Sequence, residues 1–259
     1  MTQDHDDVRL NKLMAERGLC SRREADAWIA AGRVRVNGEV AVMGQRVSPL
    51  AQVEVDGQAQ AESAARLTLL LHKPMGFVSG TPEDGHQAAV TLVTPERRWR
   101  GDSSGVSLRG ADRKGLAPAG RLDADSTGLL VFTQDGRVAR RLVGDQGDVE
   151  KEYLVRVTCT HQGQVVQQGV RPLVPRHVLD RLRHGLSLDG QALREAQVTW
   201  QNDEQLRFVL RQGKKRQIRR MCEAVGLRVV GLKRVRIGGV ALGQLPVGQW
   251  RVLGRNEAF

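Results

Sequence analysis

The sequence has few aromatic residues, few cysteines and no long apolar run, and each shortage argues against a class of protein. Aromatic residues make up 3% of the 259 positions, which disfavours a site that stacks neutral sugars. Cys20, Cys159 and Cys222 lie far apart, without the spacing of a zinc site or a disulfide framework. No apolar run reaches the roughly 20 residues that cross a bilayer, and the opening MTQDHDD is acidic, unlike a signal peptide. We therefore expect a protein of the reducing cytoplasm, with no membrane partner and no metal.

Positive charge, by contrast, is abundant. Forty Lys and Arg residues oppose 29 Asp and Glu, giving a net charge of +11 and a pI near 10.5. A surplus of this size is typical of proteins that bind a polyanion, most often nucleic acid. Between Arg207 and Arg236 there are eleven Lys or Arg against Glu223 alone, and residues 8–50 carry eight basic and four acidic side chains. This clustering predicts a binding face.

The first 50 residues have the pattern of a small helical module. Leu10, Leu13 and Met14 are spaced as on one face of a helix. Ser21 and Glu24 have the spacing of a capping box, which predicts the start of a second helix. The turn pair Asn37-Gly38 then lies between alternating apolar residues, the strongest short-range signal for a β-hairpin.

The stretch RLNKLMAERGLCSRREADAWIAAGRVRVNG resembles the S4 domain, a small RNA-binding module of ribosomal proteins and RNA-modifying enzymes. The resemblance spans most of residues 8–55, and we place the domain at 8–58. The resemblance implies that one face contacts the phosphates of structured RNA. Such contacts fix the position of the protein on the RNA more than they select a sequence. For any single arginine, a solvated surface position is the simpler interpretation. The residues expected on the RNA-binding face are Lys12, Arg22, Arg23 and Arg35.

A second domain is expected from residue 67 to residue 255. The segment AQAESAAR (59–66) is small and polar and has no apolar periodicity, so we predict a linker there. Beyond it the runs LTLLLHKP, GLLVFT, YLVRVT, QVTWQ, QLRFVLR and KRVRIGGV predict strands. Two helices are expected, over GRVARRLVG and over residues 215–225. Strands outnumber helices without regular alternation, which predicts an α+β domain with a mainly antiparallel mixed sheet.

Residues 92–119 are rich in Gly, Ser, Arg and Asp, with almost no apolar pattern. A structureless loop of that length is usually functional or disordered. Its arginines could extend an RNA surface, and disorder is an equally open interpretation.

Three aspartates lie in the segment GRLDADSTGLLVFTQDG (120–136). Asp135-Gly136 is most simply a turn pair, without chemistry. Asp125 is expected to cap or brace the loop together with its hydroxyl neighbours. Asp123 could be a third turn former, but two other segments favour a chemical role.

The first of these segments is EKEYLV, which holds Tyr153, the only tyrosine of the chain. The second is GKKRQIRRM (213–221), where Ile218 and Met221 predict a buried helix face and the arginines point elsewhere. Some of these arginines would bind phosphate, and one could pair with a buried carboxylate.

The segments HKPMGFVSG, GRLDADSTGLLVFTQDG, EKEYLV and GKKRQIRRM, in this order behind an S4-like module, resemble the RsuA/RluB/RluE/RluF family of pseudouridine synthases. Within that family, EKEYLV, RRMCEAVG and LPVGQWR are most similar to the RluF branch. The resemblance covers nearly the whole chain. It implies an isomerase that converts a specific uridine of 23S ribosomal RNA to pseudouridine without a cofactor or metal. A transfer RNA as second substrate is left open, and a monomer is expected.

The resemblance also implies roles for particular residues. Asp123 would act at C1′ of the uridine as the glycosidic bond breaks, either by adding covalently or by first removing a ribose proton. Arg219 would pair with this aspartate and hold it ionised. Tyr153 would stack on the uracil and help to manage the proton at C5, and Arg121 would help to displace the nucleotide from its helix. Further RNA contacts are expected at Leu122, Ala124, Lys214, Lys215, Arg216, Gln217 and Arg220.

Two other functions compete with this interpretation. A non-catalytic S4-type protein that binds ribosomal RNA would need the basic face, but not Asp123, Tyr153 and Arg219 together. A glycoside hydrolase could use Asp123 and Asp125 as paired carboxylates, but the basic surroundings disfavour a neutral glycan. DNA as the partner is disfavoured by the resemblance to the S4 domain.

Overall fold

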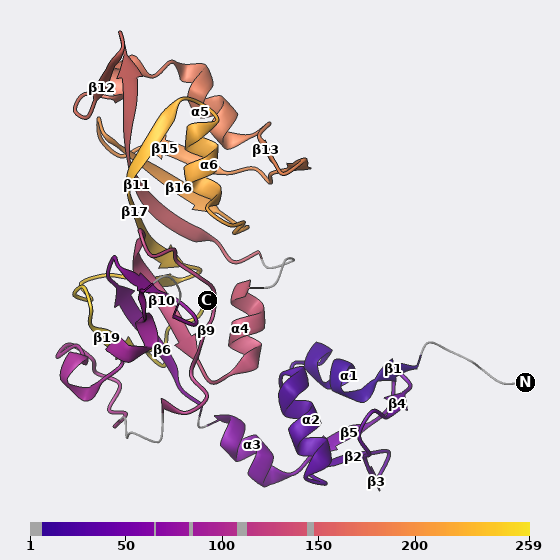
Figure 1. Ribbon diagram of the computed structural model, residues 1–259. Coiled ribbons are helices and arrows are strands. Elements are labelled where there is room, and N and C mark those ends of the chain that lie inside the picture. The colour runs from indigo at the N-terminus through magenta and orange to yellow at the C-terminus, as the bar shows by residue number, and fades with distance from the viewer. Residues whose placement is uncertain (1–6, 65, 83–84, 108–112, 144–147) are drawn as a thin grey trace, which may run out of the picture.

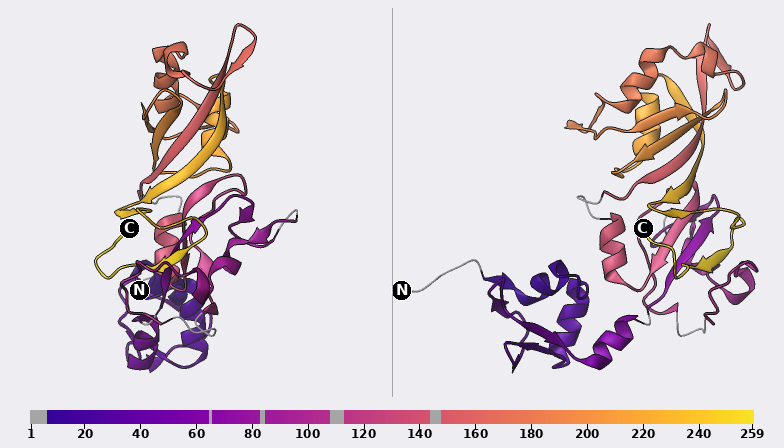
Figure 2. Two further views of the ribbon diagram at one scale, coloured as in Figure 1. Left: turned by 90° about the vertical axis from the view of Figure 1, so that its left-hand side faces the viewer. Right: turned by 180° about the vertical axis from the view of Figure 1, so that it is seen from behind.

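The computed structural model describes residues 7–64, 66–82, 85–107, 113–143 and 148–259. A small N-terminal module is joined through a helix to a larger domain that has two halves (Figure 1). The two halves follow one another along a long axis, with the module beside the lower half (Figure 2). The architecture is α+β, as the sequence predicts.

The N-terminal module begins with two helices, α1 (Leu10–Glu16) and α2 (Arg22–Ala30). The predicted capping box is confirmed, because Ser21 N–H donates to the Glu24 carboxylate at 2.7 Å and Glu24 N–H donates to Ser21 Oγ at 3.4 Å. The apolar faces of both helices are buried in one core. This cap therefore fixes where the second helix starts.

Short strands complete the module. They are β1 (Val8–Arg9), β2 (Val34–Val36), β3 (Glu39–Val40), β4 (Arg46–Val47) and β5 (Val53–Val55). β2 and β3 form the predicted hairpin, and β5 pairs with the other edge of β2. Asn37 and Gly38 both have positive φ, at +50° and +87°, as a two-residue hairpin turn requires.

The segment between the two domains is helical rather than irregular. α3 covers Gly57–Ala64, and the Asp56 carboxylate accepts a hydrogen bond from Ala59 N–H at 2.7 Å. Ala59 is fully buried in the core of the module. Alanine has the highest helix propensity, so an Ala-rich segment behind an Asp cap forms a helix without apolar periodicity.

The larger domain is organised around a sheet of ten strands. These are β6 (Thr68–Lys73), β9 (Ala117–Pro118), β10 (Thr127–Thr133), β11 (Lys151–His161), β12 (Gln164–Val166), β15 (Gln197–Trp200), β16 (Gln205–Leu210), β17 (Leu227–Ile237), β18 (Val240–Ala241) and β19 (Trp250–Val252). The main path runs β15-β16-β11-β17-β10-β6-β19. Only the β10–β17 pair on this path is parallel, so the mainly antiparallel mixed sheet is confirmed.

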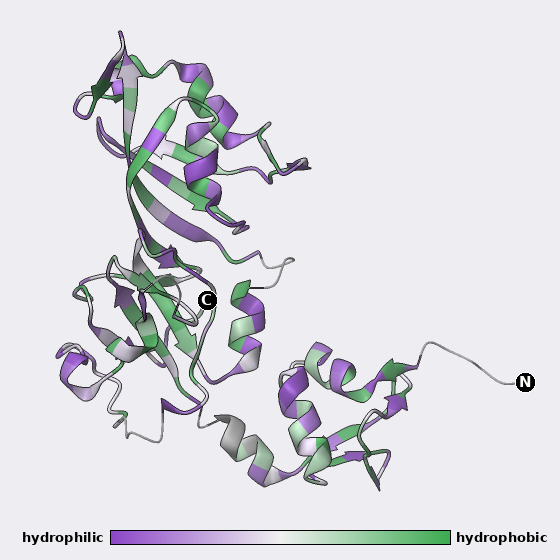
Figure 3. Ribbon diagram, viewed as in Figure 1, coloured by the Kyte–Doolittle hydropathy of each residue, from purple (hydrophilic) through white to green (hydrophobic). Residues whose placement is uncertain are grey.

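β10 joins the two cores of the larger domain. Leu130 and Phe132 belong to the larger core, whereas Leu129 and Val131 belong to a smaller one. Successive side chains of a strand point to opposite faces, so this strand is buried on both sides and reads as a continuous apolar run. Apolar residues accordingly concentrate on the strands in the middle of the molecule (Figure 3).

Three helices cover the sheet. α4 (Gly136–Val143) packs on the smaller core through Leu142, and α6 (Gln217–Glu223) packs on the larger one. The sequence predicts both. α5 (Arg176–Arg183) was not predicted, because its charged sequence RHVLDRLR buries only Val178 and Leu182. Among the described residues, no helix is long and apolar enough to span a membrane.

The loop over residues 92–119 is folded wherever the structure describes it. Arg98 pairs with Asp102 at 2.9 Å and lies over the Trp250 ring at 5.6 Å. Asp102 also accepts from Val252 N–H at 3.1 Å, and Trp250 Nε1 donates to Thr94 O at 2.7 Å. Disorder is therefore the wrong interpretation for 92–107 and 113–119, while 108–112 lie outside the described residues.

The remaining elements are short. They are β7 (Phe77–Val78), β8 (Gln87–Ala88), β13 (Ser187–Leu188), β14 (Gln191–Ala192) and the 3-10 helices η1 (Ala89–Leu92), η2 (Pro95–Arg97) and η4 (Arg171–Leu173).

The N-terminal module contacts the larger domain at the start of α4. Arg140 Nη1 donates to Ala15 O at 3.0 Å, and Arg66 forms an ion pair with Glu24. A Cβ atom at Gly136 would lie 2.3 Å from the Cβ of Ser21. The close approach of the two domains therefore depends on glycine at this position.

We expect Gly136→Ala to loosen this contact. Overpacking costs about 1–3 kcal/mol. The arrangement in which the N-terminal module is detached from the larger domain should therefore become about tenfold more populated, and proteases should cleave within α3 correspondingly faster. Gly57→Ala is the matched control, since Gly57 also begins a helix but a Cβ there meets nothing within 4 Å. Equal cleavage rates for wild type and Gly136→Ala would contradict the expectation.

Candidate active site

Hydrogen bonds to the segment HKPMGFVSG (72–80) hold the loop that carries Asp123. Leu122 N–H donates to Ser79 Oγ at 2.8 Å, and the Ser79 hydroxyl donates to Leu122 O at 2.9 Å. Gly76 N–H donates to Ala124 O at 2.8 Å. Backbone groups on both sides of Asp123 are thus fixed, while the Asp123 side chain is 36% exposed. The loop therefore presents the Asp123 carboxylate, and two residues later that of Asp125, which is 42% exposed, on a rigid base.

Two arginines of the segment GKKRQIRRM lie beside this loop, in a different pairing from the expected one. Arg216 Nη1 is 3.7 Å from Asp123 Oδ2. Arg219 Nη2 instead pairs with Asp125 Oδ1 at 3.1 Å and donates to Asp125 O at 2.8 Å. Arg219 Nη1 donates to Val229 O at 3.2 Å, which ties this guanidinium to β17 and directs it at Asp125. The expected Arg219–Asp123 ion pair is therefore replaced by an Arg216–Asp123 contact.

Asp125 is the most heavily paired group of the loop. Its carboxylate accepts from Arg216 at 3.1 and 3.4 Å, in addition to the ion pair with Arg219. Partial burial raises the pKa of Asp125, but the hydrogen bond from Arg216 and the charge of Arg219 outweigh it, so the pKa lies below its ordinary value. The expectation that Asp125 braces the loop agrees with these contacts.

Tyr153 is linked to the same loop through Arg234. Tyr153 is 8% exposed on β11, and the guanidinium carbon of Arg234 lies 6.0 Å from the centre of its ring. Arg234 Nη1 donates to Arg121 O at 3.2 Å, and Nε donates to Leu129 O at 2.7 Å. The structure therefore brings the tyrosine strand and the aspartate loop together through one buried arginine.

Sequence reasoning missed Arg234 by counting it as surface charge. It is 2% exposed, and it follows Leu232 by two residues on the same face of β17. An arginine in register with buried residues of a strand is the signal that could have identified it.

Lys73 is a second buried cation that the sequence did not single out. Its side chain is fully buried, and Nζ donates to Pro74 O at 2.8 Å and to Phe77 O at 2.7 Å. Burial lowers the pKa of Lys73 to about 8, although the negative charges of Asp123 and Asp125 act in the opposite direction. The lysine thus places a positive charge beneath the aspartate loop.

This buried lysine makes a prediction about stability. Between about pH 8 and pH 10.5 the unfolded chain holds a proton on Lys73 that the folded chain releases, so stability rises with pH. We expect wild type to gain on the order of 2 kcal/mol relative to Lys73→Met between pH 7.5 and pH 10. Chemical denaturation of both proteins at the two pH values measures this gain. If the difference in free energy of unfolding between wild type and Lys73→Met does not change with pH, burial does not lower the pKa of Lys73.

The basic residues predicted on the N-terminal module are accessible. Arg22, Arg23 and Arg35 are exposed, and Lys12, with 45% of its side chain exposed, lies 3.7 Å from Glu16. Arg22 and Arg23 line a cleft of about 1220 Å³ between the module and α4, opposite Arg140 and Arg141 of the larger domain. This cleft adjoins the end of β10 that is farther from Asp123.

The other predicted RNA contacts divide into exposed and buried residues. Arg121, Lys215 and Arg216 are exposed, and Ala124 and Lys214 are half-buried. Arg220 is half-buried and makes two hydrogen bonds to Asp189, at 2.6 and 2.8 Å.

Gln217 and Leu122 are buried. Gln217 is 4% exposed, and its Oε1 accepts from Lys214 N–H at 2.9 Å, because it closes the turn that begins α6. Leu122 is 7% exposed and belongs to the larger core. Both side chains are thus buried, as is that of Tyr153, and the expected RNA contacts of Gln217 and Leu122 stay predictions.

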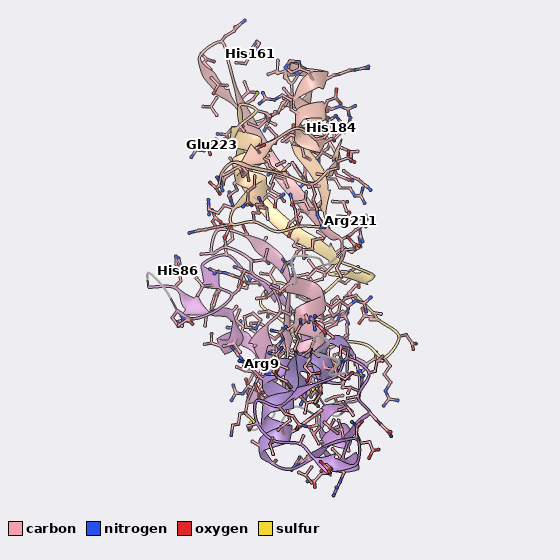
Figure 4. All side chains as sticks on the ribbon, turned by 90° about the vertical axis from the view of Figure 1, so that its right-hand side faces the viewer. Arg9, His86, His161, His184, Arg211 and Glu223 are labelled. Carbon is pink, nitrogen blue, oxygen red and sulfur yellow. The ribbon has the colours of Figure 1, made fainter. Side chains whose placement is uncertain are left out.

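Several of the eleven basic residues between 207 and 236 are held in ion pairs. Arg207 and Arg236 both pair with Glu152, at 2.6 and 2.8 Å, and Arg211 pairs with Glu150 at 3.4 Å. Figure 4 shows Arg211 and Glu223 toward opposite edges of the molecule. Part of the positive charge on β16 and β17 is therefore taken up by ion pairs on the sheet, and the predicted binding face stays a prediction for the other basic residues.

The site is built from acidic, basic and aromatic side chains. Among the described residues, no group of three or more His, Cys, Asp or Glu side chains could hold a metal ion. The groups that converge are the carboxylates of Asp123 and Asp125, the guanidinium groups of Arg216 and Arg219, and a buried phenol ring that is joined to the loop through Arg234. Such a set can hold a phosphate chain, stack a base and offer a carboxylate to a sugar carbon.

Comparison with known proteins identifies this combination. Residues 67–224 match the RNA pseudouridylate synthase family, and residues 8–50 match the S4 domain. The chain belongs to the RNA pseudouridylate synthase family and carries an S4 domain at its N-terminus. The family resemblance seen in the sequence is confirmed, and the protein is an enzyme that makes pseudouridine in RNA.

Individual relatives agree with this assignment. The dual-specificity RNA pseudouridine synthase RluF of Escherichia coli (strain K12) is 35% identical over 252 residues, which cover 96% of this chain and 77% of the relative. The ribosomal large subunit pseudouridine synthase B of Vibrio cholerae is 37% identical over 256 residues, covering 95% and 71%. A crystal structure of a pseudouridylate synthase shares the fold with a TM-score of 0.60 and 24% identity over 96% of both chains.

Proposed function

We propose that the protein isomerises a specific uridine of 23S ribosomal RNA to pseudouridine, with Asp123 as the catalytic carboxylate and without a cofactor. The observation that carries the proposal is the accessible Asp123 carboxylate, held on a fixed loop with Arg216 at 3.7 Å. The names of the relatives support an RNA of the large ribosomal particle.

The chemistry needs one carboxylate and a confined base. Asp123 acts at C1′ while the bond from C1′ to N1 of the uracil breaks, either by adding to C1′ or by removing a ribose proton. The freed uracil turns within the site and forms a new bond from C5 to C1′, as Asp123 leaves C1′ or returns the proton to the ribose. The proton on C5 is then lost, and N1 takes up a proton, so the product is an isomer of the substrate.

The other residues act on the base and on the strand. Tyr153 provides a ring face against which the uracil stacks, and Arg234 fixes that ring relative to the loop. Arg121, which is exposed next to the buried Leu122, takes the place of the extracted nucleotide. The strand is held by phosphate contacts at Lys12, Arg22, Arg23 and Arg35 of the S4 domain.

The test uses RNA that lacks this modification. Ribosomal RNA from a strain without the gene is incubated with purified protein, and pseudouridines are mapped by carbodiimide treatment and primer extension. We expect one new stop in 23S RNA, and parallel reactions with transfer RNA report a second substrate. Binding of 23S RNA without any new pseudouridine would favour the non-catalytic S4-type protein instead.

A further inference from the structure

Asp125 stands at the centre of the charged groups around Asp123. Its Oδ1 lies within 3.4 Å of both Arg216 Nη1 and Arg219 Nη2, and its Oδ2 accepts from Arg216 Nη2 at 3.1 Å. One carboxylate therefore bridges two guanidinium groups of the same helical segment. Asp123, two residues earlier, has a single and longer contact to that segment.

The backbone at Arg216 makes this bridge more than a surface ion pair. Arg216 is the residue before α6 and has φ +51° and ψ +32°, a left-handed conformation that costs free energy in a residue other than glycine. Such a conformation persists only when neighbouring contacts hold it. The two hydrogen bonds to Asp125 are side-chain contacts that can do so, and they point the guanidinium into the site.

Arg219 is anchored independently of Asp123. It donates to Asp125 O and to Val229 O, and only 15% of its side chain is exposed. The Asp125 carboxylate thus lies between a fixed arginine, Arg219, and an adjustable one, Arg216, whose side chain is 44% exposed. The two hydrogen bonds that Asp125 accepts from Arg216 therefore set the position of Arg216 relative to Asp123.

We propose that Asp125 is a positioning residue for the reaction, acting through Arg216: its carboxylate fixes the guanidinium group that lies nearest to the Asp123 carboxylate. The inference rests on the proposed function of Asp123. Asp125 itself need not touch the uridine. Its role is to hold the Arg216 guanidinium group beside the reacting Asp123 carboxylate, so that this carboxylate keeps its orientation.

The test is the effect of Asp125→Asn on kcat and KM for the 23S RNA substrate. An asparagine keeps the shape but turns an N–H donor toward a guanidinium donor, so we expect kcat to fall at least tenfold while KM changes less than threefold. Asp125→Glu keeps the charge and should lose less than Asp125→Asn. Wild-type kcat in Asp125→Asn, an effect confined to KM, or equal losses in the two variants would overturn the proposal.

Two further measurements separate positioning from folding. Asp135→Asn removes a carboxylate that pairs with Arg137 at 2.7 Å at the other end of β10, and it should leave kcat unchanged. In a double-mutant cycle, Asp125→Asn combined with Arg216→Gln should be no slower than Arg216→Gln alone, since both remove one interaction. If the two losses in kcat multiply in the double variant, the proposal is contradicted. A melting temperature of Asp125→Asn more than a few degrees below that of wild type would also contradict it.

The outcome is distinguishable from a failure of the proposed function. If wild type forms no pseudouridine, the proposed function is wrong. If wild type is active and Asp125→Asn is equally active, only the positioning role is wrong.

Discussion

Replacing Asp123 with asparagine is expected to reduce pseudouridine formation by about 10⁴-fold or more, because removal of a nucleophile commonly has an effect of this order. The amide keeps the shape and the hydrogen-bond acceptor but can neither add to C1′ nor accept a proton from the ribose. The affinity for RNA should change only a few-fold, since phosphate contacts elsewhere dominate it. Nucleoside analysis of RNA sampled over time, together with filter binding, measures both quantities.

The control for this variant is Asp135, the third aspartate of the same segment. Asp135 accepts from Arg137 N–H at 2.9 Å at the start of α4, which is a turn and helix-cap role. Asp135→Asn should therefore retain activity, whereas Asp123→Asn should not. If Asp123→Asn forms pseudouridine at the wild-type rate, the carboxylate is not catalytic.

Gly128→Ala is expected to destabilise the fold by about 3 kcal/mol or more. Gly128 begins the buried part of β10 and pairs with Arg234 on the parallel strand β17. Its φ is +112°, and a Cβ there would lie 2.2 Å from Arg234 O and 2.6 Å from Arg234 N. The clash is with backbone on a central strand, so it cannot be relieved by moving a side chain. Chemical denaturation of the variant measures the loss.

A glycine eight residues earlier provides the matched control. Gly120 has φ +100°, but a Cβ there would meet nothing within 4 Å. Gly120→Ala should therefore cost only the backbone strain, about 1–3 kcal/mol, and less than Gly128→Ala. Equal losses would mean that strain, and not the approach of β17, accounts for the glycine at 128.

The elements predicted from sequence are those specified by local chemistry. The capping box at Ser21 and Glu24, the Asn37-Gly38 hairpin and the continuous apolar run of β10 each depend on residues close together in the chain. α3 was missed because its signals, alanine and the Asp56 cap, produce no apolar stripe. The order in residues 92–107 was missed because Trp250 and Val252, far along the chain, supply its contacts.

The sequence predicted several residues that the fold brings together at the candidate site, but not their contacts. Arg216 and Arg219 are three residues apart, so helical periodicity places both near one face and cannot decide which of them reaches Asp123. Lys73 and Arg234 were missed for a different reason. In the sequence both look like exposed surface charges. The fold instead buries each beneath the aspartate loop, where backbone carbonyls accept hydrogen bonds from it.

The central claim is that Asp123 breaks the glycosidic bond of a uridine that is then rejoined through C5. Because the new bond forms at C5, RNA labelled with tritium at C5 of uridine must release tritium to water as the product forms. With enzyme in excess, wild type should release the tritium of one uridine per RNA, and Asp123→Asn should release none above background. Release by Asp123→Asn at the wild-type rate, or no release by wild type from its RNA, would contradict it.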